Sequence, residues 1–418
     1  MSMKATPGGP FPAETWDNIV DHLWNDRNAL AACSYTCHAL LPASRYHRFH
    51  CVSLYRSHHY HSFETLLVEC QYVAQYVRVL YISGSYRNNP SGWLYLLQKL
   101  CRLSHLTLEG FPFRIPEEFR SDLRLRSLIP HLRTLKICAM QSDGDDLASL
   151  ICASGALSTL TLLDSSISSE DRWSSALSVD GSLGCNVDTF IWVPHHGFTA
   201  KPNLDMLTRW FEGGQRCLRR LATTEIGSEF TPHWLVQKLL DASGDFLEHL
   251  FLHFPDRPLS GDDSPKPVSI PDLGNNTRLK TLHMAFGHCP PDITSKLCTP
   301  SARDAFGSLA LVVIRIVVHE DYREIDWQDP CIELGDLCLD HPLLNLVICF
   351  EFRGRADAST FARKVIRFVQ RLPTLHRTGG RVRFGIVWMG HSDSFFTRGL
   401  DGKYHAPEYF LGDPEWYH

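Results

Sequence analysis

The sequence predicts an α/β fold in which a short helical element is followed by an irregular solenoid of strands and helices. Two observations predict it. Residues 10–54 carry apolar residues at helical spacing, and from residue 77 onward the pattern φ-x-x-φ-x-φ, where φ is apolar, recurs at intervals close to 29 residues. With 418 residues, 44% hydrophobic and 21% charged, the chain has a globular composition and enough length for a large core or two domains.

The N-terminal element is expected to begin after a disordered tail, residues 1–9. Pro12 suits the first turn of a helix, because its missing N–H would have no partner there. Trp16, Ile19 and Leu23 then follow at helical spacing. Asp26 is expected to cap a second helix, since its carboxylate can accept from the first free backbone N–H groups. The apolar side of that second helix is formed by Leu30, Cys33 and Cys37.

A third helix is expected to open at Leu41-Pro42-Ala43-Ser44, and Phe49, Val52 and Leu54 lead from it into a strand. About 45 residues cannot bury this much apolar surface by themselves. Part of the surface must therefore face another domain or another protein. A plain helical cap on the domain that follows is the alternative.

Residues 10–54 resemble an F-box, the helical motif that docks onto the Skp-type adaptor of cullin-RING ubiquitin ligases. The resemblance, closest to the fungal type, is carried by Pro12, Glu14, Ile19, Leu23, Asp26, Leu30, Cys33, Cys37 and the segment 41–49. Phe11 replaces the family's Leu, Thr15-Trp16 replaces an aliphatic pair, and Leu40 replaces a Trp. The resemblance implies that an apolar surface is presented to the adaptor by Phe11, Pro12, Ile19, Leu23, Leu30, Cys33 and Cys37.

The repeated pattern occurs ten times in the rest of the chain. The copies begin at Val77, Leu103, Leu132, Leu157, Val187, Leu218, Leu247, Leu279, Phe306 and Leu343. In the x-φ-x-φ part of each copy the apolar residues point to one face of a short strand. Segments with a helical period lie between strands, as in 63–77, 93–100 and 361–372. Because one such unit cannot bury its apolar side alone, the units should stack into a solenoid over residues 55–376.

This solenoid resembles a leucine-rich-repeat domain of the kind found in F-box proteins. The family places Asn or Cys three residues after the second strand Leu. Those positions here hold Phe111, Met140, Ser165, His195, Pro255 and Gly287. The asparagine ladder is missing, so an irregular solenoid is expected. The alternative is an ordinary α/β domain whose strands share a pattern.

Two segments are expected to be surface loops, and the C-terminus is expected to close the solenoid. Residues 255–277 contain five prolines, and residues 141–146 form an acidic turn. The repeat pattern fades from Arg377, and residues 377–418 are rich in aromatic residues and glycine. We expect this segment to cap the last repeat, with an aromatic substrate-binding patch as the alternative.

Composition and motifs exclude several classes of function. The formal charge of −5 argues against a general nucleic-acid binder, and no apolar run reaches 18 residues. The N-terminus lacks the apolar segment of a signal peptide, so a cytoplasmic or nuclear location is expected. The 14 cysteines form no Cys-x-x-Cys pair and are expected to be free thiols. No catalytic signature occurs, and the histidines near 47–61 and 283–289 lack a spacing that enforces zinc binding, so no enzyme activity, cofactor or metal is expected.

The two resemblances together imply a substrate-recognition subunit of an SCF-type cullin-RING E3 ubiquitin ligase that marks a protein for proteasomal degradation. The chain would bind the Skp-type adaptor, and through it the cullin, while the solenoid holds a protein substrate on its strand-lined face or C-terminal end. Holding the substrate lysine near a loaded conjugating enzyme raises its effective concentration. The alternative is a leucine-rich-repeat scaffold that binds a partner and recruits no ligase.

Overall fold

The computed structural model describes residues 12–83, 92–110, 115, 129–139, 141–163, 166–168, 187–193, 218–224, 226, 231–254, 270–286, 306–319, 337–353, 382–388, 396–399 and 404–405. The expected tail 1–9, Phe11, the six consensus Asn/Cys positions and the helix expected at 361–372 lie outside these residues. The chain divides into unit 1, Met1–Asn186, and unit 2, Val187–His418. Each unit is mixed α/β, with an open sheet of mainly parallel strands.

Unit 1 begins with three short helices, α1 (Ala13–Asp21), α2 (Arg27–Thr36) and α3 (Leu41–His50). The Asp26 carboxylate caps α2 by accepting from the backbone N–H groups of Asn28 at 3.0 Å and Ala29 at 2.9 Å. Pro42 stands in the first turn of α3, where its missing N–H leaves no bond unmade. The helices enclose a small core of Val20, Leu30 and Leu40.

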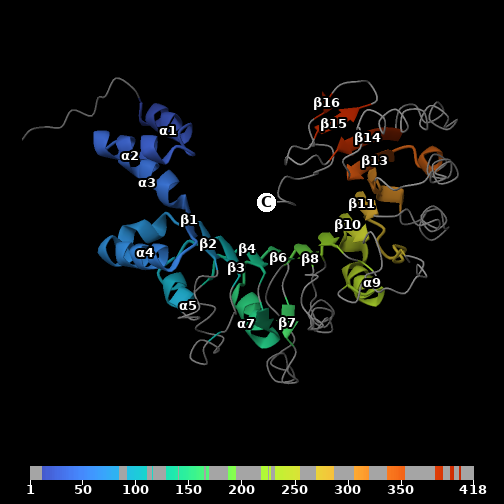
Figure 1. The fold of residues 1–418 in the computed structure, drawn as a ribbon, viewed down its shortest axis with the longest axis horizontal. Coiled ribbons are helices and arrows are strands. Elements are labelled where there is room, and N and C mark those ends of the chain that lie inside the picture. Colours follow the sequence, from blue (N-terminus) through green and yellow to red (C-terminus); the bar gives the residue numbers. More distant parts are fainter. Residues whose placement is uncertain are drawn as a thin grey trace, which may run out of the picture. The chain divides into compact units, whose positions relative to one another are not determined.

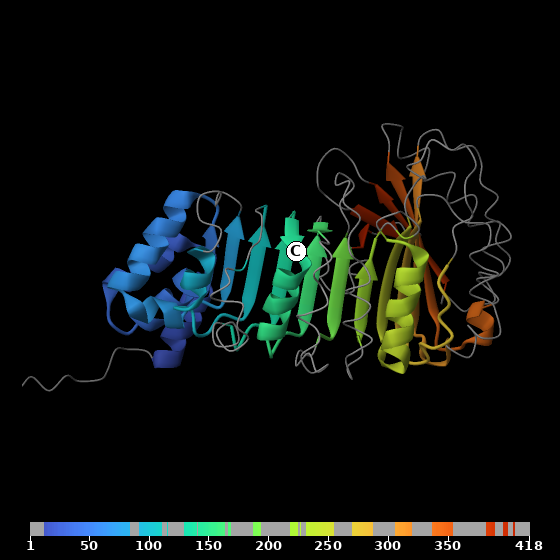
Figure 2. The ribbon, with the colours of Figure 1, turned by 90° about the horizontal axis from the view of Figure 1, so that it is seen from below.

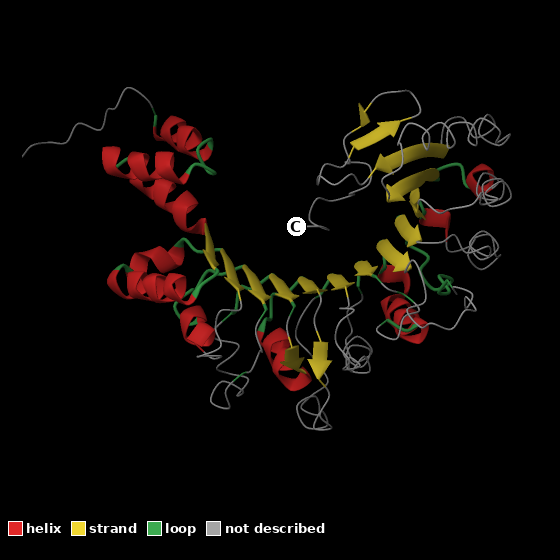
Figure 3. Cartoon of the chain, viewed as in Figure 1, coloured by secondary structure: helices red, strands yellow, loops and turns green. Residues whose placement is uncertain are grey.

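The sheet of unit 1 contains five parallel strands in the order β1 (Cys51–Leu54), β2 (Val79–Ser83), β3 (His105–Glu109), β4 (Thr134–Cys138) and β6 (Thr159–Leu163). The second and fourth residues of β2, β3 and β4 are buried. Figures 1 and 3 show α4 (Ser57–Glu69), α5 (Gly92–Leu97) and α7 (Gly144–Ala153) on one side of these strands. The 3₁₀ helix η1 (Gln71–Gln75) follows α4. The expected strand pattern is therefore confirmed here, and α4, α5 and α7 cover the same face of the sheet.

Strand β1 is a further copy of the repeat that the sequence analysis did not count. Val52 lies in register with Leu80, and Leu54 with Ile82. Phe49-x-x-Val52-x-Leu54 therefore repeats the pattern, 28 residues before Val77. Since α3 ends at His50 and β1 starts at Cys51, the third helix runs directly into the first strand of the sheet.

The described residues of unit 2 form seven parallel strands, β8 (Thr189–Val193), β9 (Arg220–Thr223), β10 (His249–Phe254), β11 (Thr281–Phe286), β12 (Leu311–His319), β13 (Asn345–Arg353) and β14 (Val382–Trp388). Antiparallel strands β15 (Phe396–Gly399) and β16 (Tyr404–His405) follow. Helix α9 (His233–Ser243) is followed by the 3₁₀ helix η3 (Gly244–Phe246), and η4 (Phe306–Ser308) precedes β12. The parallel ladder thus extends through β14, beyond the expected end of the solenoid at residue 376.

The structure corrects the last two copies of the pattern in different ways. Leu282 pairs with Val312 and Met284 with Ile314, so the copy begins at Leu309 and not at Phe306. In the final copy the strand residues Leu346 and Ile348 pair as the pattern predicts. Leu343, however, is 75% exposed, and the neighbouring Leu344 is buried in its place.

The acidic segment 141–146 is not a simple turn. Gln141–Asp143 forms β5, which pairs in parallel with β7 (Ser166–Ser168), and α7 begins at Gly144. The helix forms because Leu147, Leu150 and Ile151 fall on one side and are buried. In the other expected loop, residues 270–277 are turns and extended chain, and 255–269 lie outside the described part.

Candidate functional site

The first candidate surface is the outside of α1–α3, where the sequence placed its site residues. Pro12 and Cys37 are exposed, and Ile19 is 44% exposed. Leu23 and Cys33 are half-buried and pack against the three-helix core. Leu30 is fully buried between Val20 and Leu40, so it belongs to this core and not to the exposed surface expected for it. The predicted set therefore divides into an outer and an inner group.

Two exposed aromatic residues join this surface. Trp24 is 65% exposed in the turn after α1, and Tyr35 is 87% exposed near the end of α2. The sequence analysis did not include either among the site residues. Asp26 could have pointed to Trp24, because a helix cap at Asp26 places the residues just before it in a turn.

Contacts from α3 fix this three-helix element on the sheet of unit 1. His47 Nε2 lies 2.7 Å from an Asp21 carboxylate oxygen, which links α3 to the end of α1. The Arg45 guanidinium stacks over the Tyr72 ring at 4.4 Å, linking α3 to η1. The backbone N–H of Arg78 donates to the carbonyl of His50 at 3.0 Å. These contacts therefore hold α1–α3 in a fixed position against the first repeats of unit 1.

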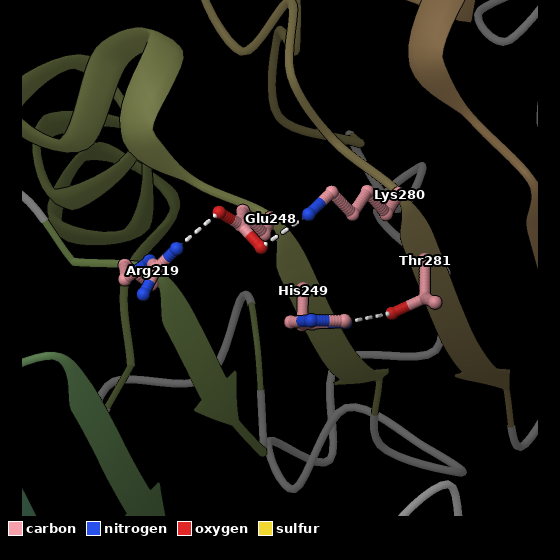
Figure 4. Close-up of polar contacts among 5 residues, drawn as sticks. All are labelled: Arg219, Glu248, His249, Lys280 and Thr281. Carbon is pink, nitrogen blue, oxygen red and sulfur yellow. Dashed lines mark hydrogen bonds and ion pairs between the residues drawn. The ribbon is translucent and has the colours of Figure 1, made fainter.

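The second candidate site is a ladder of charged residues in unit 2. It occupies the position directly after the first apolar residue in the first four copies of unit 2, held by Asp188, Arg219, Glu248 and Lys280. Glu248 accepts from Arg219 Nη2 at 2.8 Å and from Lys280 Nζ at 2.7 Å, as Figure 4 shows. The hydrogen bonds from Lys280 and Arg219 lower the pKa of the Glu248 carboxyl to about 2. The alternating charges at this constant position are the sequence signal that would have revealed the ladder.

The face of β10 and β11 beside this ladder is neutral and partly aromatic. His249 Nδ1 lies 2.8 Å from the Thr281 hydroxyl (Figure 4), and the rings of Phe251 and His283 are 6.4 Å apart. Burial lowers the pKa of His283 to about 4 and also lowers the pKa of His249. Both histidines are therefore uncharged near neutral pH and can donate or accept hydrogen bonds.

A buried ion pair lies further along the sheet of unit 2. Arg315 on β12 pairs with the fully buried Glu351 on β13, beside Cys349, which is register partner of Arg315. Burial raises the pKa of the Cys349 thiol, which therefore stays protonated and is a poor nucleophile. A buried ion pair beside a protonated thiol is typical of a structural cluster in a protein interior and not of a catalytic centre.

Within the described ranges, no three His, Cys, Asp or Glu side chains gather closely enough to hold a metal ion. None of the helices in that part of the chain combines the length and the apolar character needed to cross a bilayer. No protein-family model and no curated protein matches this chain.

Proposed function

We propose that the chain is a substrate-recognition subunit of an SCF-type cullin-RING ubiquitin ligase, acting in the cytoplasm or nucleus, with α1–α3 as an F-box and the strand–helix units as a degenerate leucine-rich-repeat solenoid. One observation carries the proposal. The three-helix element that resembles an F-box keeps Ile19, Trp24 and Tyr35 on its outside. Exposed Trp and Tyr often anchor protein interfaces, because each buries a large area with few rotatable bonds.

The rigid attachment of α1–α3 to the sheet of unit 1 supports the same function. A substrate receptor must hold its substrate at a defined position relative to the adaptor, because proximity is all that it contributes to ubiquitin transfer. The direct run of α3 into β1 and the Arg45–Tyr72 contact leave no flexible linker between the docking helices and the repeats of unit 1. The chain then needs no catalytic residues of its own.

The scaffold alternative is favoured by a different observation. Leu30 is sealed inside the core, while Leu23 and Cys33 are partly covered. In that alternative the helices only close the N-terminal end of the sheet, and the chain binds a partner without recruiting a ligase.

Co-purification with a recombinant Skp-type adaptor tests the proposal. The informative variant is Ile19→Asp with Tyr35→Asp, because both side chains are exposed and their replacement should leave the three-helix core intact. The matched control is Val68→Asp with Leu343→Asp, which replaces two apolar residues of 61% and 75% exposure elsewhere. We expect adaptor binding to fall at least about tenfold in the first variant, since one interface anchor contributes roughly 2 kcal/mol, and to persist in the control.

Circular dichroism and melting temperature should match across the three proteins. If folded wild-type protein does not bind the adaptor, the ligase function is wrong and the scaffold function is favoured.

A further inference from the structure

The segments that lead into β2, β3 and β4 of unit 1 carry positive charge, and neither they nor the segment before β6 carry negative charge. Four turns precede β2, β3, β4 and β6, namely residues 70–78, 98–104, 129–133 and 154–158. They contain no Asp or Glu, but contain Arg78, Lys99, Arg102 and Arg133, which we call the basic edge. His105 and His131 are exposed beside them.

The backbone brings the basic edge together. Ser104 N–H donates to the Arg78 carbonyl at 2.9 Å, and Arg133 N–H donates to the Ser104 carbonyl at 2.8 Å. Arg78, Ser104 and Arg133 thus occupy equivalent positions just before the neighbouring parallel strands β2, β3 and β4. Figure 2 shows the starting ends of these strands side by side along one border of the sheet. Neighbouring strands are about 4.8 Å apart, so the Cα atoms of Arg78 and Arg133 are roughly 10 Å apart.

The charges of the basic edge are not neutralised by the part of the chain that the structure describes. Lys99, Arg102 and Arg133 are exposed and make no ion pair there. Arg78 donates to the Gln75 carbonyl at 2.7 Å, which orients its guanidinium without cancelling its charge. In unit 2 the positive charges at the same repeat position are neutralised by a carboxylate, because Arg219 and Lys280 both donate hydrogen bonds to Glu248.

We infer that the basic edge of unit 1 binds an acidic segment of a partner protein. Guanidinium groups bind carboxylates through paired N–H donors, and unpaired arginines are available for this. A chain in the extended polyproline II conformation has three residues per turn and rises about 3.1 Å per residue, so carboxylates three residues apart lie on one side, about 9 Å from each other. This spacing matches the roughly 10 Å between Arg78 and Arg133. A short row of four cations on a chain of net charge −5 suits a few carboxylates better than the dense charge of a nucleic acid.

This inference goes beyond the proposed function and does not depend on it. The basic edge lies at the strand starts of β2, β3 and β4, whereas adaptor docking uses α1–α3. If the chain is a substrate receptor, the acidic segment belongs to its substrate; if it is a scaffold, the segment belongs to its partner.

Fluorescence anisotropy with the full chain tests the inference. The probe is a labelled peptide with glutamate at every third position among glycine and serine, and its matched control has glutamine instead. We expect the glutamate peptide to bind more tightly, with an affinity that falls as salt screens the charges. Arg102→Glu with Arg133→Glu should weaken binding at least about tenfold, because two attractive contacts become repulsive.

The matched variant is Arg27→Glu with Arg278→Glu, which changes the net charge equally at two exposed sites outside the basic edge. It should bind the glutamate peptide within about twofold of wild type. Equal binding of both peptides by the wild-type chain, or equal loss in both variants, overturns the inference. Tighter binding of an oligothymidylate of the same charge also overturns it, in favour of a nucleic acid. Adaptor co-purification of the Arg102/Arg133 variant should be unchanged, so this test and that of the proposed function give separate answers.

Discussion

Glu248 shows how one side chain can join three copies of the repeat. Its own strand is β10, while Arg219 precedes β9 and Lys280 precedes β11. The repeated apolar pattern predicts the strands but says nothing about this carboxylate. Glu248 is the first of the two residues between the first two apolar positions, and the pattern places no requirement on either of them. The exposed Trp24 and Tyr35 were missed for a related reason. Periodicity shows which residues share a face, but not which of them a small core leaves uncovered.

Replacing Glu248 with Gln should remove a pH-dependent part of the stability of unit 2. The pKa of Glu248 is about 2 in the folded chain against an ordinary 4.5, so the unfolded chain takes up the proton first as the pH falls. The stabilisation is present above pH 4.5 and is lost between pH 4.5 and 2. We expect about 1 kcal/mol at pH 7, since its partners are half-exposed.

Urea unfolding of both proteins across this pH range measures the effect. The difference between wild type and Glu248→Gln should close as the pH approaches 2. A difference that is the same at pH 7 and at the acid end would show that the ion pairs contribute nothing.

The strands were the most predictable elements. Among the helices between them, α4 and α5 overlap the segments expected to be helical at 63–77 and 93–100, whereas α7 begins where a turn was expected. The alternation of buried and half-exposed residues in β2, β3, β4 and β8 follows directly from the apolar pattern. The register could not be read from the sequence at Leu309, since an alignment that starts at Phe306 buries similar side chains. At Leu343 and Leu344 the strand register is as predicted, but the pattern does not show which of the two leucines is buried. Strand β1 was missed as a repeat because its pattern overlaps the end of a helix.

The C-terminal end of helix α9 is capped in part by a residue that belongs to the next repeat. Gly244 adopts φ +51°, a conformation that residues with a side chain rarely take, and this stops the helix. The fully buried Asn276, which precedes the next strand, donates its amide N–H groups to the carbonyls of Leu240 at 3.0 Å and Gly244 at 2.8 Å. The helix end is thus tied to the following repeat.

We expect Asn276→Ala to destabilise unit 2 by about 2 kcal/mol, because the buried carbonyl of Leu240 and the part-buried carbonyl of Gly244 lose their donor. The neighbouring Asn275 provides the control. It is exposed and donates only to the Asp241 carboxylate at 3.2 Å, so Asn275→Ala should change stability by less than about 0.5 kcal/mol. The midpoint of urea unfolding measures both variants, and equal midpoints for the two would contradict the capping role.

The whole chain combines elements of very different size, and the smallest depends on its neighbour. The core of α1–α3 contains three fully or nearly fully buried apolar residues, Val20, Leu30 and Leu40. A core of this size does not hold a fold of about 40 residues together without help. The sequence indicated this surplus of exposed apolar surface, but the Arg45–Tyr72 contact joins residues with no pattern in common and could not be foreseen.

Inserting a short Gly-Ser segment between His50 and Cys51 should therefore loosen α1–α3 while leaving the sheet of unit 2 unchanged. The insertion separates α3 from β1 and strains the Arg78–His50 hydrogen bond and the Arg45–Tyr72 contact. Each contributes roughly 1 kcal/mol, so amide hydrogens of α2 should exchange at least about tenfold faster. Hydrogen-exchange mass spectrometry of Arg27–Thr36 measures this, with β10 as the internal reference.

The same segment inserted in the exposed turn between Pro342 and Leu343 should leave α2 protected. If α2 keeps its full protection after insertion at His50, the three helices are an independent domain, and a stiff mounting cannot explain how a bound substrate would be presented.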